Sequence, residues 1–141
     1  IYDRLVGSEM CIRDSPELAH VGLGEAKAAA VWGEGNIRTQ SVKLTDNDRA
    51  VAERRTEGML KLVTHRNGRV LGATILAPHA GEMISAWALA ISARRKIAGM
   101  AGLVVPYPTF ADAGKRAAGQ FFTEALFSRR TRTLVRWLLK L

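Results

Sequence analysis

The sequence predicts an α+β domain of two layers, in which helices cover an antiparallel sheet. Two strand-like runs, residues 59–64 and 70–76, flank Asn67-Gly68, and an Asn-Gly pair in that setting favours a tight hairpin turn. Residues 80–96 then carry apolar side chains at helical spacing. Strands and helices do not alternate as regular β-α-β units, which would indicate a parallel sheet.

The first half of the chain supplies strands and two short helices. Residues 1–15 show neither helical nor strand periodicity, so we expect a foreign or disordered leader there. Residues 17–23 predict an apolar strand, and the Ala-rich residues 24–32 predict a helix. Residues 37–44 alternate as a half-exposed strand does, and Asp46 or Asn47 can cap a helical turn that runs to residue 54.

The second half supplies the covering helices. The apolar stripe of residues 80–96 should lie on the sheet. Val105-Pro106-Tyr107-Pro108 must be extended, because proline keeps the residue before it out of the α region. A helix should follow to about residue 127. We expect residues 16–128 to form the domain and residues 129–141 a basic amphipathic helix.

Composition limits the function classes. The 21 Lys and Arg exceed the 13 Asp and Glu, for a formal charge of +8, which suggests nucleic acid or an anionic membrane as a partner. The longest apolar stretch, residues 83–93, is about half the length of a membrane span. The single cysteine, Cys11, cannot form an internal disulfide or a redox pair. We expect a cytoplasmic protein.

The basic C-terminal helix leaves an alternative function open. Residues 129–141 contain no acidic side chain and could lie on an anionic bilayer, although such a helix more often packs on its own domain or on a dimer partner. Nucleic-acid binding is not expected, because interleaved aromatic side chains are missing. The alternative is a free-standing basic adaptor for an anionic membrane surface or nucleic acid.

Two motifs are rejected as cofactor or metal sites. Gly22-Leu23-Gly24 lacks the third glycine and the β-α-β setting of a dinucleotide fingerprint. His79 and Glu82 could share a helix face, but no third ligand is apparent, so no metal is expected.

Three stretches in order carry a family resemblance: PELAHVGLGEAKA, DRAVAERRTEGMLKLVTHRNGRVLGATILAPHAGEMISAWALAI and VPYPTFADAGKRAA. Over residues 16–118 the chain resembles the dimerisation domain of the pyridine nucleotide-disulfide oxidoreductase family, which includes dihydrolipoamide dehydrogenase, glutathione reductase and mercuric reductase. The resemblance implies a homodimer formed through the helix of residues 80–96 and the loop of residues 105–112. It also implies that this loop completes the partner's active site, and that FAD and NAD(P)H bind to domains absent from this chain. The fragment alone should bind no cofactor and be inactive.

The loop departs from the family pattern. Most members carry His-Pro-Thr there, with a Glu five positions after the His; Tyr107 and Asp112 stand in those two places. The resemblance implies that Tyr107 and Asp112 are catalytic in the partner's site, and that Tyr107 and Pro108 lie near its flavin. Because a tyrosine titrates near ~10 and a histidine near ~6.5, Tyr107 is expected to donate a hydrogen bond or orient the substrate rather than shuttle a proton.

Two further features bear on these roles. A tyrosine in this loop is typical of the mercuric reductase branch, yet that branch also has a C-terminal cysteine pair, and no cysteine follows Cys11 here. Thr109 and Asp112 also fit a capping box, in which the Thr hydroxyl accepts from the third amide and the acid reaches back to the first. That structural role is compatible with a position beside Tyr107.

Overall fold

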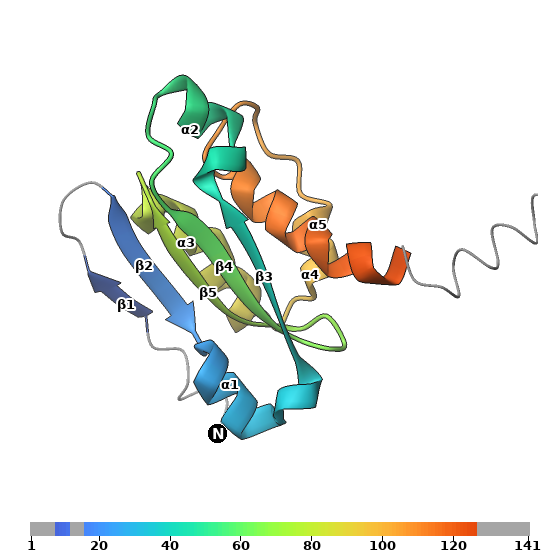
Figure 1. The fold of residues 1–141 in the computed structure, drawn as a ribbon. Helices are drawn as coiled ribbons and strands as arrows, with labels where there is room; N and C mark the ends of the chain where they lie inside the picture. Colours follow the sequence, from blue (N-terminus) through green and yellow to red (C-terminus); the bar gives the residue numbers. More distant parts are fainter. Residues whose placement is uncertain (1–7, 12–15, 127–141) are drawn as a thin grey trace, which may run out of the picture.

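The computed structural model describes residues 8–11 and 16–126, which form one five-stranded sheet with helices against it (Figure 1). The strand order is β1-β2-β5-β4-β3, and every neighbouring pair is antiparallel. The predicted α+β class is therefore confirmed. The strands are β1 (Ser8–Cys11), β2 (Glu17–Gly22), β3 (Ile37–Lys43), β4 (Met59–His65) and β5 (Val70–Ala77).

The helices gather mainly on one face of the sheet. They are α1 (Glu25–Trp32), α2 (Asp48–Ala52), α3 (Ala80–Ser92), α4 (Ile97–Ala101) and α5 (Asp112–Leu126). Helix α3 packs on β2 and β5, and α5 packs on β3 and β4, so these two helices share the face behind the sheet in Figure 1. Large apolar side chains of both layers meet there, among them Leu60, Leu62, Ile75, Ile84 and Trp87. This layer is the main hydrophobic core.

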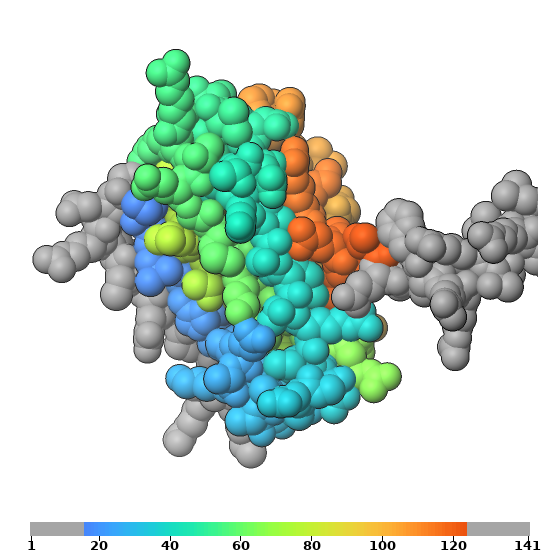
Figure 2. Space-filling view, viewed as in Figure 1, coloured from blue at the N-terminus to red at the C-terminus, as the bar shows by residue number. Residues whose placement is uncertain are grey.

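The opposite face of the sheet is only partly covered. Helix α1 packs over one end of it, where Ala28 joins a small cluster with Leu23, Val63 and Leu71. Figure 2 looks onto this face and shows strand side chains at the surface between α1 and α2. Helices α3 and α5 thus cover one face of the sheet, and the chain between them contains α4 and the loop that leads to α5.

The hairpin between β4 and β5 forms where Asn67-Gly68 predicts it. The Asn67 carboxamide accepts a hydrogen bond from the Arg69 amide at 3.0 Å, and Gly68 takes a φ of +88°. The His65 amide donates to the Arg69 carbonyl at 2.8 Å. A left-handed glycine at this position is what a tight turn needs.

The single helix predicted over residues 80–96 was wrong at its C-terminal end. Helix α3 stops at Ser92, Arg94 takes a left-handed φ of +51°, and a separate short helix, α4, follows. The break lets the Arg95 carbonyl accept from the Val70 amide at 3.3 Å, while the Ile97 amide donates to the Gly68 carbonyl at 2.7 Å. These bonds attach the segment to the hairpin, a pairing that local sequence does not reveal.

Strand β1 was not predicted, because its residues lack strand periodicity. It pairs antiparallel with β2 from Ser8 opposite Val21 to Cys11 opposite Leu18. Backbone groups of an edge strand can pair without any side-chain pattern. The origin of residues 1–15 stays a prediction, and the basic helix of residues 129–141 lies outside the described residues. Within the described part of the chain, every helix is too short or too polar to cross a bilayer.

Candidate functional site

The proline loop, residues 102–111, joins α4 to α5 and passes beside α2 (Figure 1). Tyr107, within the predicted extended segment, is 70% accessible to solvent, and Val104, just before that segment, is 93% accessible. The Tyr107–Pro108 peptide bond is cis. The Thr109 hydroxyl donates a hydrogen bond to the Pro106 carbonyl at 2.8 Å. Tyr107 therefore lies at the surface, in a turn that the hydrogen bond between Thr109 and Pro106 closes.

Tyr107 is bound by a residue far away in the sequence. Its hydroxyl donates to Oδ2 of Asp48, the first residue of α2, at 2.8 Å. Asp48 in turn accepts from Nη2 of Arg116 at 3.2 Å. The same guanidinium donates from Nε to Asp112 Oδ2 at 2.7 Å and from Nη1 to the Asp46 carbonyl at 2.6 Å. Arg116 thus ties the start of α5 to the start of α2.

These neighbours shift the titration of two groups. The pKa of Tyr107 is raised above its ordinary value, first by the hydrogen bond to Asp48 and then by the negative charge of that carboxylate. The pKa of Arg116 is raised chiefly by its hydrogen bond to Asp112. Tyr107 is consequently a neutral phenol at physiological pH and cannot serve as a general base there.

A buried asparagine fixes the other side of the loop. Asn47 caps α2, because its Oδ1 accepts from the Ala50 amide at 3.0 Å. Its Nδ2 donates to the Thr109 carbonyl, also at 3.0 Å. Only 1% of Asn47 is exposed, and its bond to Ala50 is buried while its bond to Thr109 is partly buried. The expected cap at position 46 or 47 is thereby Asn47, which also has a second role in holding the loop.

The structure brings the two predicted site residues into one network without a direct bond between them. Asp112 pairs with Arg116, and Tyr107 reaches that pair through Asp48. The capping box was wrong: the Thr109 hydroxyl binds Pro106, and the helix begins only at Asp112. A cis peptide precedes Pro108, which follows Tyr107 at the exposed edge of the loop.

Sequence reasoning missed Asp48 and Arg116. The spacing of Asp112 and Arg116, four residues apart in one helix, is a signal that could have identified the second. Asp48 lies 59 residues from Tyr107, and no local pattern connects them. Its contact depends on the packing of α2 beside the loop.

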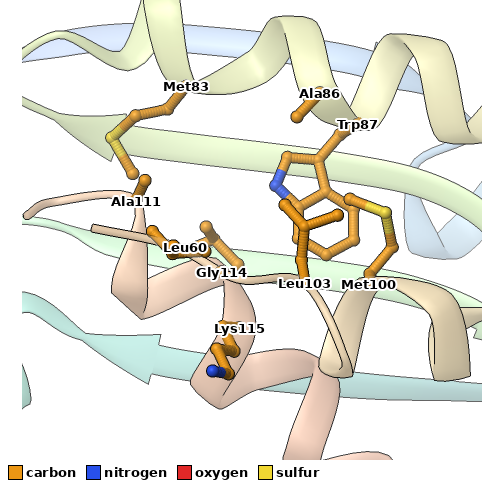
Figure 3. A pocket seen from close by; sticks show the side chains of 10 residues that line it. Leu60, Met83, Ala86, Trp87, Met100, Leu103, Ala111, Gly114 and Lys115 are labelled. Atoms are coloured by element: carbon orange, nitrogen blue, oxygen red, sulfur yellow. The ribbon is translucent and has the colours of Figure 1, made fainter. Parts of the chain in front are cut away.

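A small apolar cavity of about 50 Å³ lies under the loop, between α3, α4 and α5 (Figure 3). Met83, Trp87, Met100, Leu103 and Ala111 are among its lining side chains. The Lys115 amine is the one charged group drawn at its edge in Figure 3. A space of this size holds a few water molecules at most, whereas ligand pockets are roughly 300 Å³ or larger. The cavity is a packing gap rather than a substrate site.

Gly22, the last residue of β2, and Gly72 in β5 lie where two backbones pass close together. A Cβ on Gly22 would lie 2.4 Å from the Leu71 carbonyl oxygen, and one on Gly72 would lie 2.1 Å from that of Leu23. Gly22 and Gly72 allow two backbones to approach each other, whereas a Cβ on Gly24 would meet nothing within 4 Å. Close packing of the sheet, rather than phosphate binding, therefore accounts for Gly22. No group of three His, Cys, Asp or Glu side chains in residues 8–11 and 16–126 could hold a metal ion.

Comparison with known proteins gives a consistent result. The family model described as pyridine nucleotide-disulphide oxidoreductase, dimerisation domain, matches residues 9–118. A mercuric reductase from Shewanella putrefaciens is 38% identical over 107 residues, which are 75% of this chain and 19% of that protein. A dihydrolipoyl dehydrogenase from Synechocystis sp. is 35% identical over 100 residues, 69% of this chain and 21% of the other.

A solved structure agrees with these matches. LpdA from Mycobacterium tuberculosis superimposes with a TM-score of 0.73 at 28% identity, over 81% of this chain and 24% of that protein. The chain thus spans about a fifth to a quarter of the proteins it matches. The family match begins at residue 9, within the segment expected to be foreign.

Proposed function

Since this chain belongs to the dimerisation-domain family of the pyridine nucleotide-disulphide oxidoreductases, we propose that it forms the two-fold interface of a flavin-dependent homodimeric reductase. The intact enzyme would use FAD and NAD(P)H, held by domains outside these residues. The proline loop would enter the partner's active site. Tyr107 would face the substrate there, and Tyr107 and Pro108 would lie near the flavin.

The main support for a dimer is the composition of the outer face of α3, the side of the helix that points away from the sheet. Apart from Glu82 in the first turn, its exposed positions are uncharged and mostly small: Ser85, Ala86, Leu89 and Ser92. Leu89 is 70% exposed. A helix that faces only water normally carries charged side chains on that surface. Small residues around one exposed leucine favour close approach of another helix.

The proline loop extends this apolar surface. Leu103 and Ala86 line the same cavity, so the loop lies beside the outer side of α3. Leu103 and Val104 are both exposed. A two-fold interface would use each of these side chains twice, because the same patch is present on both subunits. A second copy of the chain is therefore the occupant we assign to this face.

Sedimentation and light scattering of purified chain test the dimer. We expect a dimer for the native sequence and a monomer for Leu89→Glu, because the substitution places two carboxylates in an apolar interface. Val31→Glu is the matched control: Val31 is 55% exposed on α1, which packs on the opposite face of the sheet, and its variant should remain dimeric. A monomeric native chain, or a dimeric L89E variant, would contradict the proposal.

The chemistry that the proline loop can provide is binding and orientation of a substrate, not proton transfer. As a neutral phenol, Tyr107 can orient or bind a substrate group, but it cannot shuttle a proton at neutral pH as imidazole does. Asp112 acts on the loop through Arg116, and we propose it as a site residue in that indirect sense. We propose a disulfide or a substrate like that of mercuric reductase, because a tyrosine in this loop departs from the histidine of most family members and is typical of the mercuric reductase branch.

Mixed dimers of the full-length enzyme test the contribution in trans. One subunit would carry Tyr107→Phe, and the other an intact loop but a defective flavin site. If the loop acts in the partner's site, the intact Tyr107 and the intact flavin meet, and activity exceeds that of the Y107F homodimer. If the loop acts within its own subunit, the mixed dimer shows no such recovery.

The basic adaptor is the rival function, and its expected binding helix lies outside the described residues. Salt-sensitive binding of a monomeric chain to anionic liposomes or oligonucleotides would favour it.

We also propose a cytoplasmic location, since one cysteine in 141 residues is unlike the disulfide-rich composition of small secreted domains.

A further inference from the structure

The hydroxyl of Tyr107 has one proton, and Asp48 accepts it. The donor–acceptor distance is 2.8 Å. A phenol has a single O–H donor and lone pairs on the same oxygen, while an ionised aspartate only accepts hydrogen bonds. With its proton turned toward α2, the phenol can offer only lone pairs to a group that approaches from solvent.

Asp48 is itself held in place. The same Oδ2 atom that accepts from Tyr107 also accepts from Arg116 at 3.2 Å. The guanidinium cannot turn freely, because Asp112 and the Asp46 carbonyl bind two of its other nitrogens. A planar guanidinium with three partners fixes its neighbours more firmly than a lysine could. The direction of the phenol proton is therefore set by Asp48 on α2 and by Arg116 on α5, which holds Asp48 in place.

We propose that Asp48 is a positioning residue which, with Arg116, makes Tyr107 a hydrogen-bond acceptor toward a proton-bearing group of the substrate, such as a thiol. Donation to a carboxylate polarises the phenol and strengthens its oxygen as an acceptor. This reverses the donor role that the sequence alone indicates for Tyr107. The inference rests on the proposed function for the place of the substrate, but the direction of the proton can be measured in the chain alone.

The charged groups that face Tyr107 are Asp48 on α2 and Asp112 and Arg116 on α5. Loss of the phenol proton would end the bond to Asp48 and place a phenolate beside two carboxylates. The pKa of Tyr107 is raised for that reason, and the Arg116 charge offsets only part of the effect. The titration of Tyr107 therefore reports whether the bond to Asp48 exists.

A Tyr2→Phe background isolates the signal, because Tyr2 and Tyr107 are the chain's two tyrosines. Absorbance titration of the phenol would be compared for Asp48→Asn and for Asp46→Asn. Asp46 is the matched control, since it lies two residues away and binds Arg116 through its backbone carbonyl. We expect D48N to lower the pKa of Tyr107, because the hydrogen bond to Asp48 and the charge of that carboxylate are its two largest causes of elevation, and D46N to leave it nearly unchanged.

Raman spectroscopy of the tyrosine Fermi doublet gives a second readout that a merely structural role would not move. In the Y2F protein and in D46N, the intensity ratio should indicate that the Tyr107 phenol is a strong hydrogen-bond donor. In D48N it should indicate a phenol that is bound to water and both donates and accepts. Asp48 is 53% exposed and the cap residue Asn47 is retained, so D48N should fold. Equal titrations of D48N and D46N, or a water-bound doublet in the Y2F protein, would overturn the inference even if the chain is dimeric.

Discussion

The side-chain amide of Asn47 donates a hydrogen bond to the backbone carbonyl of Thr109 at 3.0 Å, across 62 positions of sequence. The same side chain caps α2 through the Ala50 amide. One buried residue therefore orients both the helix that carries Asp48 and the loop that carries Tyr107. Removing it should affect the stability of the domain and the geometry of the loop together.

Replacing Asn47 by Ala should destabilise the domain by about 2 kcal/mol, because a helix cap is lost and the partly buried Thr109 carbonyl loses its partner. Asn47→Asp separates the two effects. It keeps an oxygen that can accept from Ala50 but removes the donor to Thr109, and it should cost about 1 kcal/mol or more through the unpaired carbonyl. Urea unfolding checks both values. Equal stability of N47A and the native chain would show that the cap and the loop bond contribute nothing.

Gly72 should tolerate no side chain. Its Cβ would lie 2.1 Å from the Leu23 carbonyl oxygen and 2.8 Å from the Leu23 carbonyl carbon, both backbone atoms. Gly72→Ala must therefore separate β5 from the segment after β2, and we expect a loss of roughly 2–4 kcal/mol. Gly99→Ala is the control, because α4 leaves open space around Gly99. That variant should gain up to about 1 kcal/mol in the same unfolding measurement.

Local rules explain how much of the fold the sequence could predict. Asn67-Gly68 specifies a turn by backbone conformation alone, and the β4–β5 hairpin follows it. The apolar spacing that begins near Ala80 likewise identifies α3 and its buried face. Both features depend on residues a few positions apart, which is why one sequence was enough to place them.

Contacts between distant segments explain what could not be predicted. Helix α3 ends early because Arg95 and Ile97 bind the backbone of the hairpin, which periodicity does not show. The pairing of Tyr107 with Asp48 likewise depends on how α2 packs beside the loop. In the candidate site the loop and its exposed tyrosine could be identified from the sequence, but the group that receives the tyrosine proton could not.

The contribution of Tyr107 to stability should disappear at alkaline pH. Its pKa in the folded chain is raised above the unfolded value of about 10, so the neutral phenol stabilises the fold below that pH and the effect is lost as pH rises through the folded pKa. The native chain should be slightly more stable than Tyr107→Phe at neutral pH, and the difference should shrink above ~10. Thermal unfolding across pH measures it. When both chains also carry D48N, the stability difference between them should change much less as pH rises above ~10.

The purified chain should bind neither FAD nor NAD(P)H. In the turn after β2, Gly22 belongs to the glycine pair that superficially resembles a nucleotide fingerprint, and a Cβ on it would lie 2.4 Å from the Leu71 carbonyl oxygen. Gly22 and Gly72 face each other in the β2–β5 ladder, so opening this turn for a phosphate would break the sheet. Titration of each cofactor by calorimetry should give no saturable heat, and preparations should be colourless and without reductase activity. Stoichiometric flavin absorbance in purified protein would contradict this, and would require a nucleotide site built from residues other than the turn after β2.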